Sequence, residues 1–222
     1  IDLMANRLTK ITKHIFSGSF HELHEINLSY NGIVGIESGS FDRLVNLASI
    51  DLSNNCIKHL HSDLFKKCTD MRHVYLQHNE IVKIEFNLFN AKAHLKLLNI
   101  AHNNLNSIPP FEAKSIKHFD ISHNTLTQLN LNYESHERRK LAHIEQLTVA
   151  HNKIQQCVPM MEIRTDIIHL DVSHNEINDF SEFPCLSNLE VLQLSYNNIS
   201  DLCLYNFEER LPSLRALNIS VN

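Results

Sequence analysis

The chain has 222 residues, of which 43% are hydrophobic and 20% are charged, and its formal net charge is −5. A net negative charge argues against a nucleic-acid surface, which needs clustered Lys and Arg to displace phosphate counterions. The sequence has no window of about 20 apolar residues, so this segment does not span a membrane.

One local pattern recurs along nearly the whole chain: apolar-x-x-apolar-x-apolar-x-x-Asn-x-apolar. Clean copies cover residues 47–57 and 189–199, and neighbouring copies are 21 to 28 residues apart. The asparagines of this pattern, called the ladder asparagines below, are Asn6, Asn31, Asn55, Asn79, Asn103, Asn124, Asn152, Asn175, Asn197 and Asn222. A period in this range with this pattern is typical of a leucine-rich-repeat solenoid.

Each repeat is predicted to form one short strand that ends before its ladder asparagine. The residues three and five positions before the asparagine, such as Ile26 with Leu28 and Leu98 with Ile100, share the inward face of the strand. Further buried columns are expected two and five positions after the asparagine. A Phe column ten positions after it consists of Phe16, Phe41, Phe65, Phe89 and Phe207. The asparagine amide is expected to hydrogen-bond the backbone where the chain leaves the strand.

These elements predict an α/β leucine-rich-repeat solenoid of about ten repeats. The parallel sheet lies on the concave face, and the convex face is mostly loops and short helices. Residues 1–222 are expected to form a single domain. Ile1 and Leu3 already occupy strand positions and the chain stops on Asn222, so both polar end caps are missing. We therefore expect an excerpt of a longer chain.

The spacing and the Phe column resemble the typical leucine-rich repeats of animal extracellular proteins. This group includes Toll-like receptor ectodomains and insect leucine-rich-repeat immune proteins. The Gly-x-Ile-Pro segment of plant-type repeats is absent. The resemblance implies an extracellular location, either secreted or in the ectodomain of a membrane receptor. It also implies a role in recognising other proteins.

The repeat is irregular in the middle of the chain. Residues 107–111 lie in the shortest interval and predict a compact connection without a helical turn. The longest interval contains the polar run 132–140, which is either a partner contact or a solvated loop. The repeat pattern resumes at Ile144, so we do not expect a domain boundary here.

Five cysteines and three N-glycosylation motifs bear on the location of the protein. Cys68, Cys157 and Cys185 fall on apolar columns and are expected in the core. Cys56 and Cys203 lie outside these columns and are the disulfide candidates. The glycosylation motifs begin at Asn27, Asn198 and Asn218. The repeat consensus itself favours Asn-apolar-Ser, which is the alternative explanation for two of the motifs.

The outward strand positions, which are taken to include the residue just before each ladder asparagine, define the candidate binding surface on the concave face. The residue just before the asparagine is His in five consecutive repeats: His78, His102, His123, His151 and His174. A second column contains His73, His118 and His169. Between the two columns lie Tyr75, Asn99, Asp120, Thr148 and Asp171.

Three hypotheses compete for the histidine column. The position tolerates His for reasons of scaffold geometry, or the column is part of a protein-binding surface, or stacked imidazoles bind zinc. The column lacks the Cys or converging carboxylates of a closed zinc site, so no metal or cofactor is predicted. If the column is part of a partner-binding surface, the expected partner is a protein and not a nucleic acid. The resulting complex could be a homodimer or a heterodimer.

The sequence predicts a binding protein and not an enzyme. It has no Gly-rich phosphate loop, no nucleophile-elbow motif and no His-Glu-x-x-His. The preferred function is extracellular protein recognition through the concave face, in the innate-immune class of these repeats. The alternatives are the ectodomain of a cell-adhesion or guidance receptor, and a structural spacer whose activity lies in the flanking regions.

Overall fold

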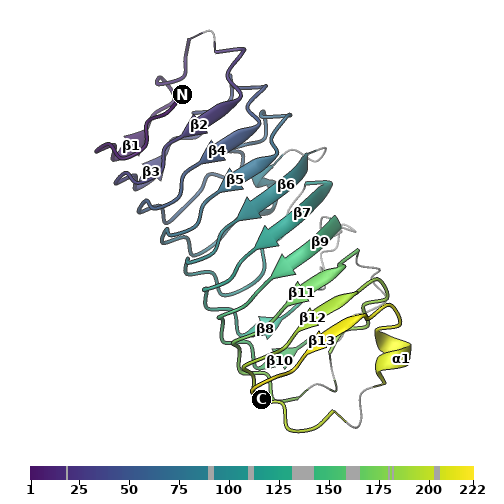
Figure 1. The fold of residues 1–222 in the computed structure, drawn as a ribbon. Coiled ribbons are helices and arrows are strands. Elements are labelled where there is room, and N and C mark those ends of the chain that lie inside the picture. Colours follow the sequence, from purple (N-terminus) through teal and green to yellow (C-terminus); the bar gives the residue numbers. More distant parts are fainter. Residues whose placement is uncertain are drawn as a thin grey trace.

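The computed structural model is a solenoid in which a parallel sheet runs the length of the molecule (Figure 1). It describes residues 1–18, 20–89, 93–109, 113–131, 143–158, 166–179, 181, 183–202 and 206–222. The nine strands of the sheet are β2 (Glu25–Asn27), β4 (Ser49–Asp51), β5 (His73–Tyr75), β6 (His94–Asn99), β7 (Ser115–Asp120), β9 (His143–Thr148), β11 (His169–Asp171), β12 (Val191–Gln193) and β13 (Ala216–Asn218). They follow one another in chain order, which confirms the predicted solenoid.

The sheet has nine strands where about ten repeats were expected. In the first repeat, only an isolated bridge from Asp2 to Asn27 extends the sheet. Two smaller parallel pairs lie elsewhere on the coils: β1 (Lys10–Ile11) with β3 (Gly35–Ile36), and β8 (Gln128–Leu129) with β10 (Gln156–Cys157). The described residues contain two short helices, the 3-10 helix η1 (Phe86–Leu88) and α1 (Phe207–Arg210). Neither is long enough to cross a bilayer.

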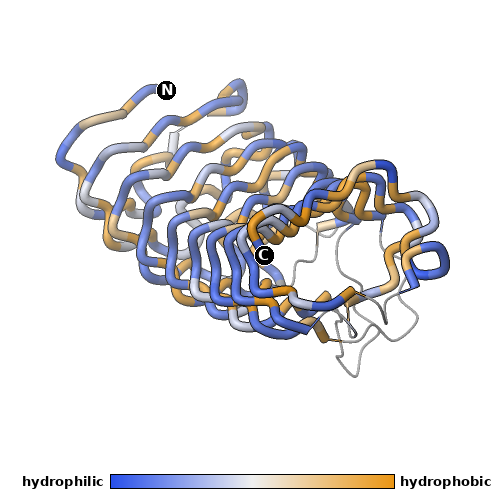
Figure 2. The backbone as a smooth tube through the Cα atoms, turned by 60° about the horizontal axis from the view of Figure 1, so that its bottom comes forward, coloured by the Kyte–Doolittle hydropathy of each residue, from blue (hydrophilic) through white to orange (hydrophobic). Residues whose placement is uncertain are grey.

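The apolar columns form one continuous core along the solenoid. Ile26, Leu28, Leu98 and Ile100 are at most 2% exposed, as the strand alternation predicts. In Figure 2, successive coils lie one behind another and repeat the alternation of hydrophobic and hydrophilic segments. Stacked coils therefore bury together the side chains that a single repeat would leave in water.

The ladder asparagines connect each coil to the one before it. Asn55 is 8% exposed, and its Nδ2 donates to the carbonyl oxygens of Leu52 and Leu28, both at 3.0 Å. Its Oδ1 accepts the N–H of Ile33 at 3.0 Å. The same pattern recurs at Asn79, Asn103, Asn124, Asn152, Asn175 and Asn197. The predicted scaffold role of the amide is confirmed.

The Phe column fills the side of the core opposite the sheet. Phe41 and Phe65 are fully buried, and their ring centroids lie 5.8 Å apart with 10° between the ring planes. Phe65 and Phe89 stack in the same way at 5.6 Å. Phe16 is 3% exposed and lies 5.8 Å from Phe41 with the rings tilted by 38°, whereas Phe207 on α1 is only partly buried. Stacked aromatic rings thus replace a helical layer in the first repeats.

The cysteine predictions are partly right. Cys68 and Cys157 are buried, and desolvation raises the pKa of each thiol to about 12. The prediction for Cys185 is wrong, because this residue is exposed and Phe183 fills the core at 1% exposure. The interval from Asn175 to Asn197 is short, so the buried position comes two residues earlier than in the regular repeats.

The strands at the centre of the sheet are longer than the others. β6, β7 and β9 have six residues each, and their register pairs His94 with Ser115 and Ser115 with His143. This part coincides with the irregular intervals of the sequence. Ile108 and Pro109 of the predicted compact connection are buried, whereas residues 110–112 and the polar run 132–140 lie outside the described residues.

Candidate recognition surface

The open face of the nine-stranded sheet, called the sheet face below, carries one aligned column of predicted binding residues. Tyr75, Asn99, Asp120, Thr148 and Asp171 are the last residues of β5, β6, β7, β9 and β11, and each pairs with the next across the sheet. All five are half-buried. The structure therefore brings these five predicted residues together in a single row.

Three members of this row also have a structural role that the sequence analysis missed. The Oδ1 atoms of Asn99, Asp120 and Asp171 accept the backbone N–H two residues later, at 2.9–3.0 Å. Asn27, Asp51 and Asn218 do the same in other repeats. Short Asx side chains commonly bond the backbone in this way where a strand ends in a turn. The available signal in the sequence was the recurrence of Asn or Asp two positions before a Ser or Ala at the end of the strands.

The five column histidines lie beyond the strands, at the rim of the sheet face. The residue before every ladder asparagine has a positive φ of 52° to 57°, from Ala5 to Val221. His is one of the residue types enriched in this left-handed conformation, whereas β-branched residues such as Val221 are rare in it. The interpretation of this column as part of the strands is therefore corrected. The backbone geometry also supports a scaffold contribution to the choice of His.

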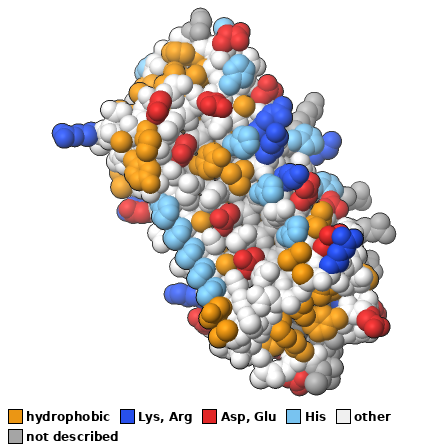
Figure 3. Space-filling model, viewed as in Figure 1, with side chains coloured by type: hydrophobic (Ala, Val, Ile, Leu, Met, Phe, Trp, Pro, Cys, Tyr) orange, Lys and Arg blue, Asp and Glu red, His pale blue; other side chains and the backbone are white. Residues whose placement is uncertain are grey.

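The rim histidines form one continuous stack of rings. Neighbouring ring centroids from His78 to His174 lie 4.0 to 4.2 Å apart with interplanar angles of 9° to 13°. Tyr196 continues the stack beyond His174 at 4.2 Å. Figure 3 shows a pale-blue row of His side chains along this rim. We call these six residues the imidazole stack.

The stack disfavours protonated imidazole. The pKa values of His102, His123 and His151 are lowered from 6.5, mainly by desolvation and then by repulsion from neighbouring histidines. Asp120 opposes this shift at His102 and His123, and Asp171 opposes it at His151. The middle of the stack is thus neutral near pH 7, with ring nitrogens able to donate and accept hydrogen bonds.

The same geometry does not suit a metal site. A metal ion lies in the plane of the imidazole that binds it, and two nearly parallel rings 4.0 Å apart do not share a plane. Within the described part of the chain, no group of three or more His, Cys, Asp or Glu could hold a metal ion.

The second histidine column lies on the strands and is half-buried. His73, His118 and His169 occupy β5, β7 and β11. The Nδ1 of His118 donates to Oε1 of Gln146 at 2.7 Å, which ties β7 to β9. The Nδ1 of His169 is buried without a hydrogen-bond partner. This column is therefore partly engaged within the sheet.

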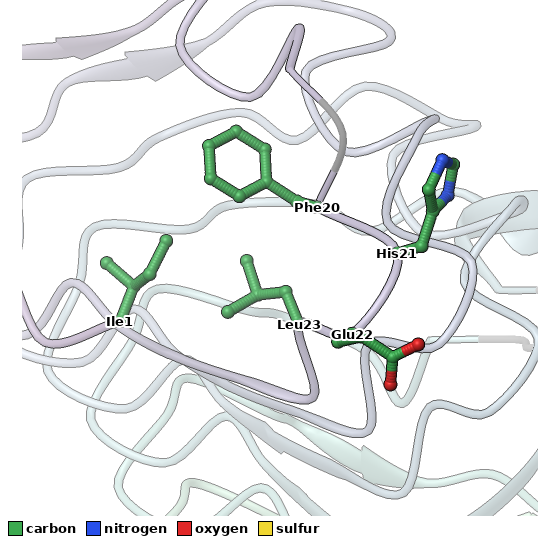
Figure 4. Close-up of a pocket in the computed structure, with 5 residues that line it drawn as sticks. All are labelled: Ile1, Phe20, His21, Glu22 and Leu23. Atoms are coloured by element: carbon green, nitrogen blue, oxygen red, sulfur yellow. The ribbon is translucent and has the colours of Figure 1, made fainter.

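Two hollows on the surface bear on whether the protein has a reaction site. One, of about 440 Å³, lies near the N-terminus and is lined by Ile1, Phe20, His21, Glu22 and Leu23 (Figure 4). The two chain segments that line it bring no nucleophile beside a base. It is mainly an open end of the core.

The second hollow, of about 450 Å³, includes Ser115, His143 and Asp166. His143 Nδ1 bonds Asp166 Oδ2, but the Ser115 hydroxyl bonds Nδ1 of His94 at 2.8 Å. A serine nucleophile needs its hydroxyl beside the free nitrogen of the histidine that the carboxylate orients. The hydroxyl instead bonds a histidine on the neighbouring strand, which does not support a catalytic triad.

The predicted modification sites differ in exposure. Asn198 is exposed, whereas Asn27 and Asn218 are half-buried at the ends of β2 and β13. Each of these two uses Oδ1 for the backbone bond, which leaves Nδ2 for a glycan. Cys56 is a free, half-buried thiol, and Cys203 lies outside the described residues. A disulfide at these positions stays a prediction.

Comparisons with known proteins agree with the fold. The family described as leucine rich repeat matches residues 1–57 and 21–81, and related repeat descriptions match residues 94–114 and 185–202. Together these matches cover more than half of the chain. Osteomodulin of Bos taurus is 28% identical over 114 residues, which are 51% of this chain and 25% of osteomodulin. The chain thus spans about a quarter of this relative.

Solved structures with similar folds come from larger proteins. The TLR13–ssRNA13 complex matches 98% of this chain and 32% of TLR13, with a TM-score of 0.80 and 23% identity. A chain of the glycosylated Toll–Spatzle complex of Drosophila matches 99% of this chain over 30% of its own length, with a TM-score of 0.76 and 21% identity. The leucine-rich repeat domain of APL1B matches 100% of this chain over 68% of its own length, with a TM-score of 0.74 and 19% identity.

Proposed function

We propose, because this chain belongs to the leucine-rich-repeat family, that it is an extracellular protein-recognition module of the innate-immune class. The sheet face is the binding surface. The observation that carries this proposal is the alignment of outward side chains in rows across nine paired strands. Side chains held on a rigid array lose little conformational entropy on binding, which favours affinity.

The structural relatives support the extracellular and immune parts of the proposal. One of them is Toll in complex with Spatzle, described as a hub in Drosophila development and innate immunity and solved in a glycosylated form. The motifs at Asn27, Asn198 and Asn218 fit a secreted chain as well. Single-domain organisation over residues 1–222 is part of the same proposal.

A binding role also agrees with the character of the family, whose folds are recognition modules and typically not enzymes. A protein partner is favoured over a nucleic acid by the net charge of −5. One protein of similar fold was solved in complex with ssRNA13, so the fold itself is compatible with a nucleic-acid ligand. The arrangement of charges on the sheet face distinguishes a protein partner from a nucleic acid more sharply than the net charge does.

Glycans at the two ends would narrow the contact area. Asn27 and Asn218 end β2 and β13, the outermost strands of the sheet. Chains attached there would cover the ends of the sheet face and leave β5 to β11 open. We therefore place the main contacts on these central strands and on the turns after them, which carry most of the imidazole stack.

Site-specific photo-crosslinking tests the proposal. A benzophenone amino acid replaces Tyr75 or Thr148 on the sheet face, and the controls replace Lys83 or Lys153, which are exposed and lie outside the nine strands. The variants are incubated with extracellular fluid or intact cells of the source tissue. The expected result is the same protein crosslinked from both sheet positions and from neither control. Equal crosslinking from the controls would contradict the proposal.

A further inference from the structure

A row of cations crosses the beginnings of the central strands. Arg72 immediately precedes β5, and Lys96 and Lys117 lie in β6 and β7. The N–H of Lys96 donates to the carbonyl oxygen of Arg72 at 2.7 Å, and the β6–β7 register places Lys96 beside Lys117. All three residues are exposed. Neighbouring strands are about 4.8 Å apart, so three positive charges lie close together on one side of the sheet face.

These cations are only partly neutralised by the protein itself. Lys117 Nζ lies 3.6 Å from a carboxylate oxygen of Glu145 on β9. Within the described residues, Arg72 and Lys96 have no carboxylate within the 4.0 Å of an ion pair. The exposed Lys114 lies just before β7 and adds to the positive charge. This end of the sheet face is therefore free to attract an anionic group.

A row of carboxylates, separated by the uncharged Tyr75, Asn99 and Thr148, lies at the ends of the strands, and only β7 carries both a cation and a carboxylate of these rows. Asp51, Asp120 and Asp171 end β4, β7 and β11, three positions after the column that contains Arg72, Lys96 and Lys117. Three residues of extended chain span about 10 Å. Figure 3 shows red side chains inward of the imidazole stack and blue side chains farther across, toward the beginnings of the strands. The charge thus changes sign along β7, and the carboxylate row extends beyond the cations on both sides, to β4 and β11.

We propose that the sheet face binds a protein segment with two lines of opposite charge, acidic over the cation row and basic over the carboxylate row. This inference rests on the proposed function and specifies the chemistry of its partner. The lines run across the strands, along the solenoid axis. Their separation of about 10 Å matches the width of an α-helix with side chains, so a helix with one acidic and one basic stripe fits the pattern.

The carboxylate row is the reason to prefer a protein over a polyanion. A nucleic acid or a polyglutamate chain lying on the cation row would also meet Asp120 and Asp171, and like charges placed opposite each other are strongly disfavoured in an interface. A two-stripe segment gains attraction from both rows. Opposite rows also fix the direction in which the partner lies, because turning it around places like charges together.

The test uses a fluorescent synthetic helical peptide with a Glu stripe and a Lys stripe. Its control has the same composition in scrambled order, and polyglutamate and an oligothymidylate serve as polyanions. Binding is measured by anisotropy at low and at physiological salt. The striped peptide is expected to bind more tightly than the other three probes, with an advantage that shrinks as salt screens the charges.

Charge-neutral variants identify the rows. Lys96→Gln and Asp171→Asn are each expected to weaken striped-peptide binding by about 2- to 5-fold, as for exposed ion pairs. Asp171→Asn retains the oxygen that accepts the Ser173 N–H, so it removes charge and not the turn. Lys153→Gln, at an exposed position outside the sheet, is expected to have no effect.

Two results would overturn the inference. One is striped-peptide binding no tighter than that of the scrambled peptide. The other is tighter binding of polyglutamate or oligothymidylate, further strengthened by Asp171→Asn, which would define a polyanion surface. Neither result affects the crosslinking criterion. If a partner crosslinks from Tyr75 and Thr148 but its binding is unchanged by both charge variants, this inference alone is contradicted. If the sheet positions crosslink no more than the control positions, the proposed function is contradicted.

Discussion

His102 and His123 stack face to face on the turns after β6 and β7, with ring centroids 4.0 Å apart and 10° between the ring planes. Desolvation and the neighbouring imidazoles lower the pKa of both residues. Face-to-face imidazoles are compatible when they are neutral and repel each other when both carry a proton. The stack therefore links the stability of the rim to pH.

The first prediction is a loss of stability in mild acid that depends on the stack. A histidine whose pKa falls below 6.5 on folding is neutral in both states at higher pH, and the unfolded chain takes up the proton first as the pH decreases. The free energy of unfolding should be highest above pH 6.5 and should fall through the interval below it. Urea unfolding at pH 7.5 and pH 5.5 measures the difference.

The matched variant for this prediction combines His102→Asn, His123→Asn and His151→Asn. Asn54 occupies the equivalent position in another repeat at a φ of 53°, so Asn suits the backbone there. The variant should show a smaller loss between the two pH values. An unchanged pH dependence would mean that other groups, such as the surface carboxylates, are responsible.

The second prediction concerns the ladder amide of Asn103. It is 6% exposed, donates to the carbonyl oxygens of Leu76 and Ile100 at 3.0 Å, and accepts the N–H of Ile81 at 2.9 Å. Asn103→Ala leaves these buried groups unpaired and should destabilise the fold by about 2–4 kcal/mol. The exposed neighbour provides the control, since Asn104→Ala should change the free energy of unfolding by less than about 0.5 kcal/mol. Similar urea midpoints for the two variants would refute the scaffold role.

The third prediction separates charge from hydrogen bonding at Asp120. Its Oδ1 accepts the N–H of Ser122 at 2.9 Å, and Asn99 forms the same bond one strand away. Asp120→Asn should retain stability within about 0.5 kcal/mol, whereas Asp120→Ala should lose about 0.5–1.5 kcal/mol. Equal stability of the two variants in thermal and urea unfolding would show that the bond contributes nothing measurable.

The fourth prediction concerns glycans. When the chain is secreted from eukaryotic cells, intact mass should show glycans at Asn27, Asn198 and Asn218 that a glycosidase removes. Single Asn→Gln variants assign each site. Absence of glycan from both Asn27 and Asn218 would remove the argument that the central strands are the open part of the sheet face.

The sequence was sufficient for the repeat register, because the pattern that identifies the repeats consists of the same residues that form the core. Ile26, Leu98 and the ladder amides lie where the pattern requires. The position of the rim histidines was predicted less well, because the alternation of inward and outward side chains was assumed to continue beyond the end of each strand. Periodicity alone does not indicate the left-handed backbone at His78 or Tyr196.

Other features depend on which residues are neighbours in three dimensions, and the pattern of a single repeat does not predict them. The Cys185 position failed because a short interval moves the core residue to Phe183. The cation row was missed because Arg72, Lys96 and Lys117 are far apart in the chain, and only the strand register makes them adjacent. The stacking of the imidazoles likewise required side-chain coordinates.

Each ladder amide from Asn31 to Asn222 bonds the coil that carries it and the coil before it, as Asn79 does with Leu76 and Leu52. Loss of a few residues inside a coil would shift that amide away from both carbonyl oxygens at once. Removal of a whole unit would leave every remaining amide with an equivalent pair of acceptors. Evolution can therefore shorten or lengthen such a chain in complete units, and so change the extent of its interface without redesigning the scaffold.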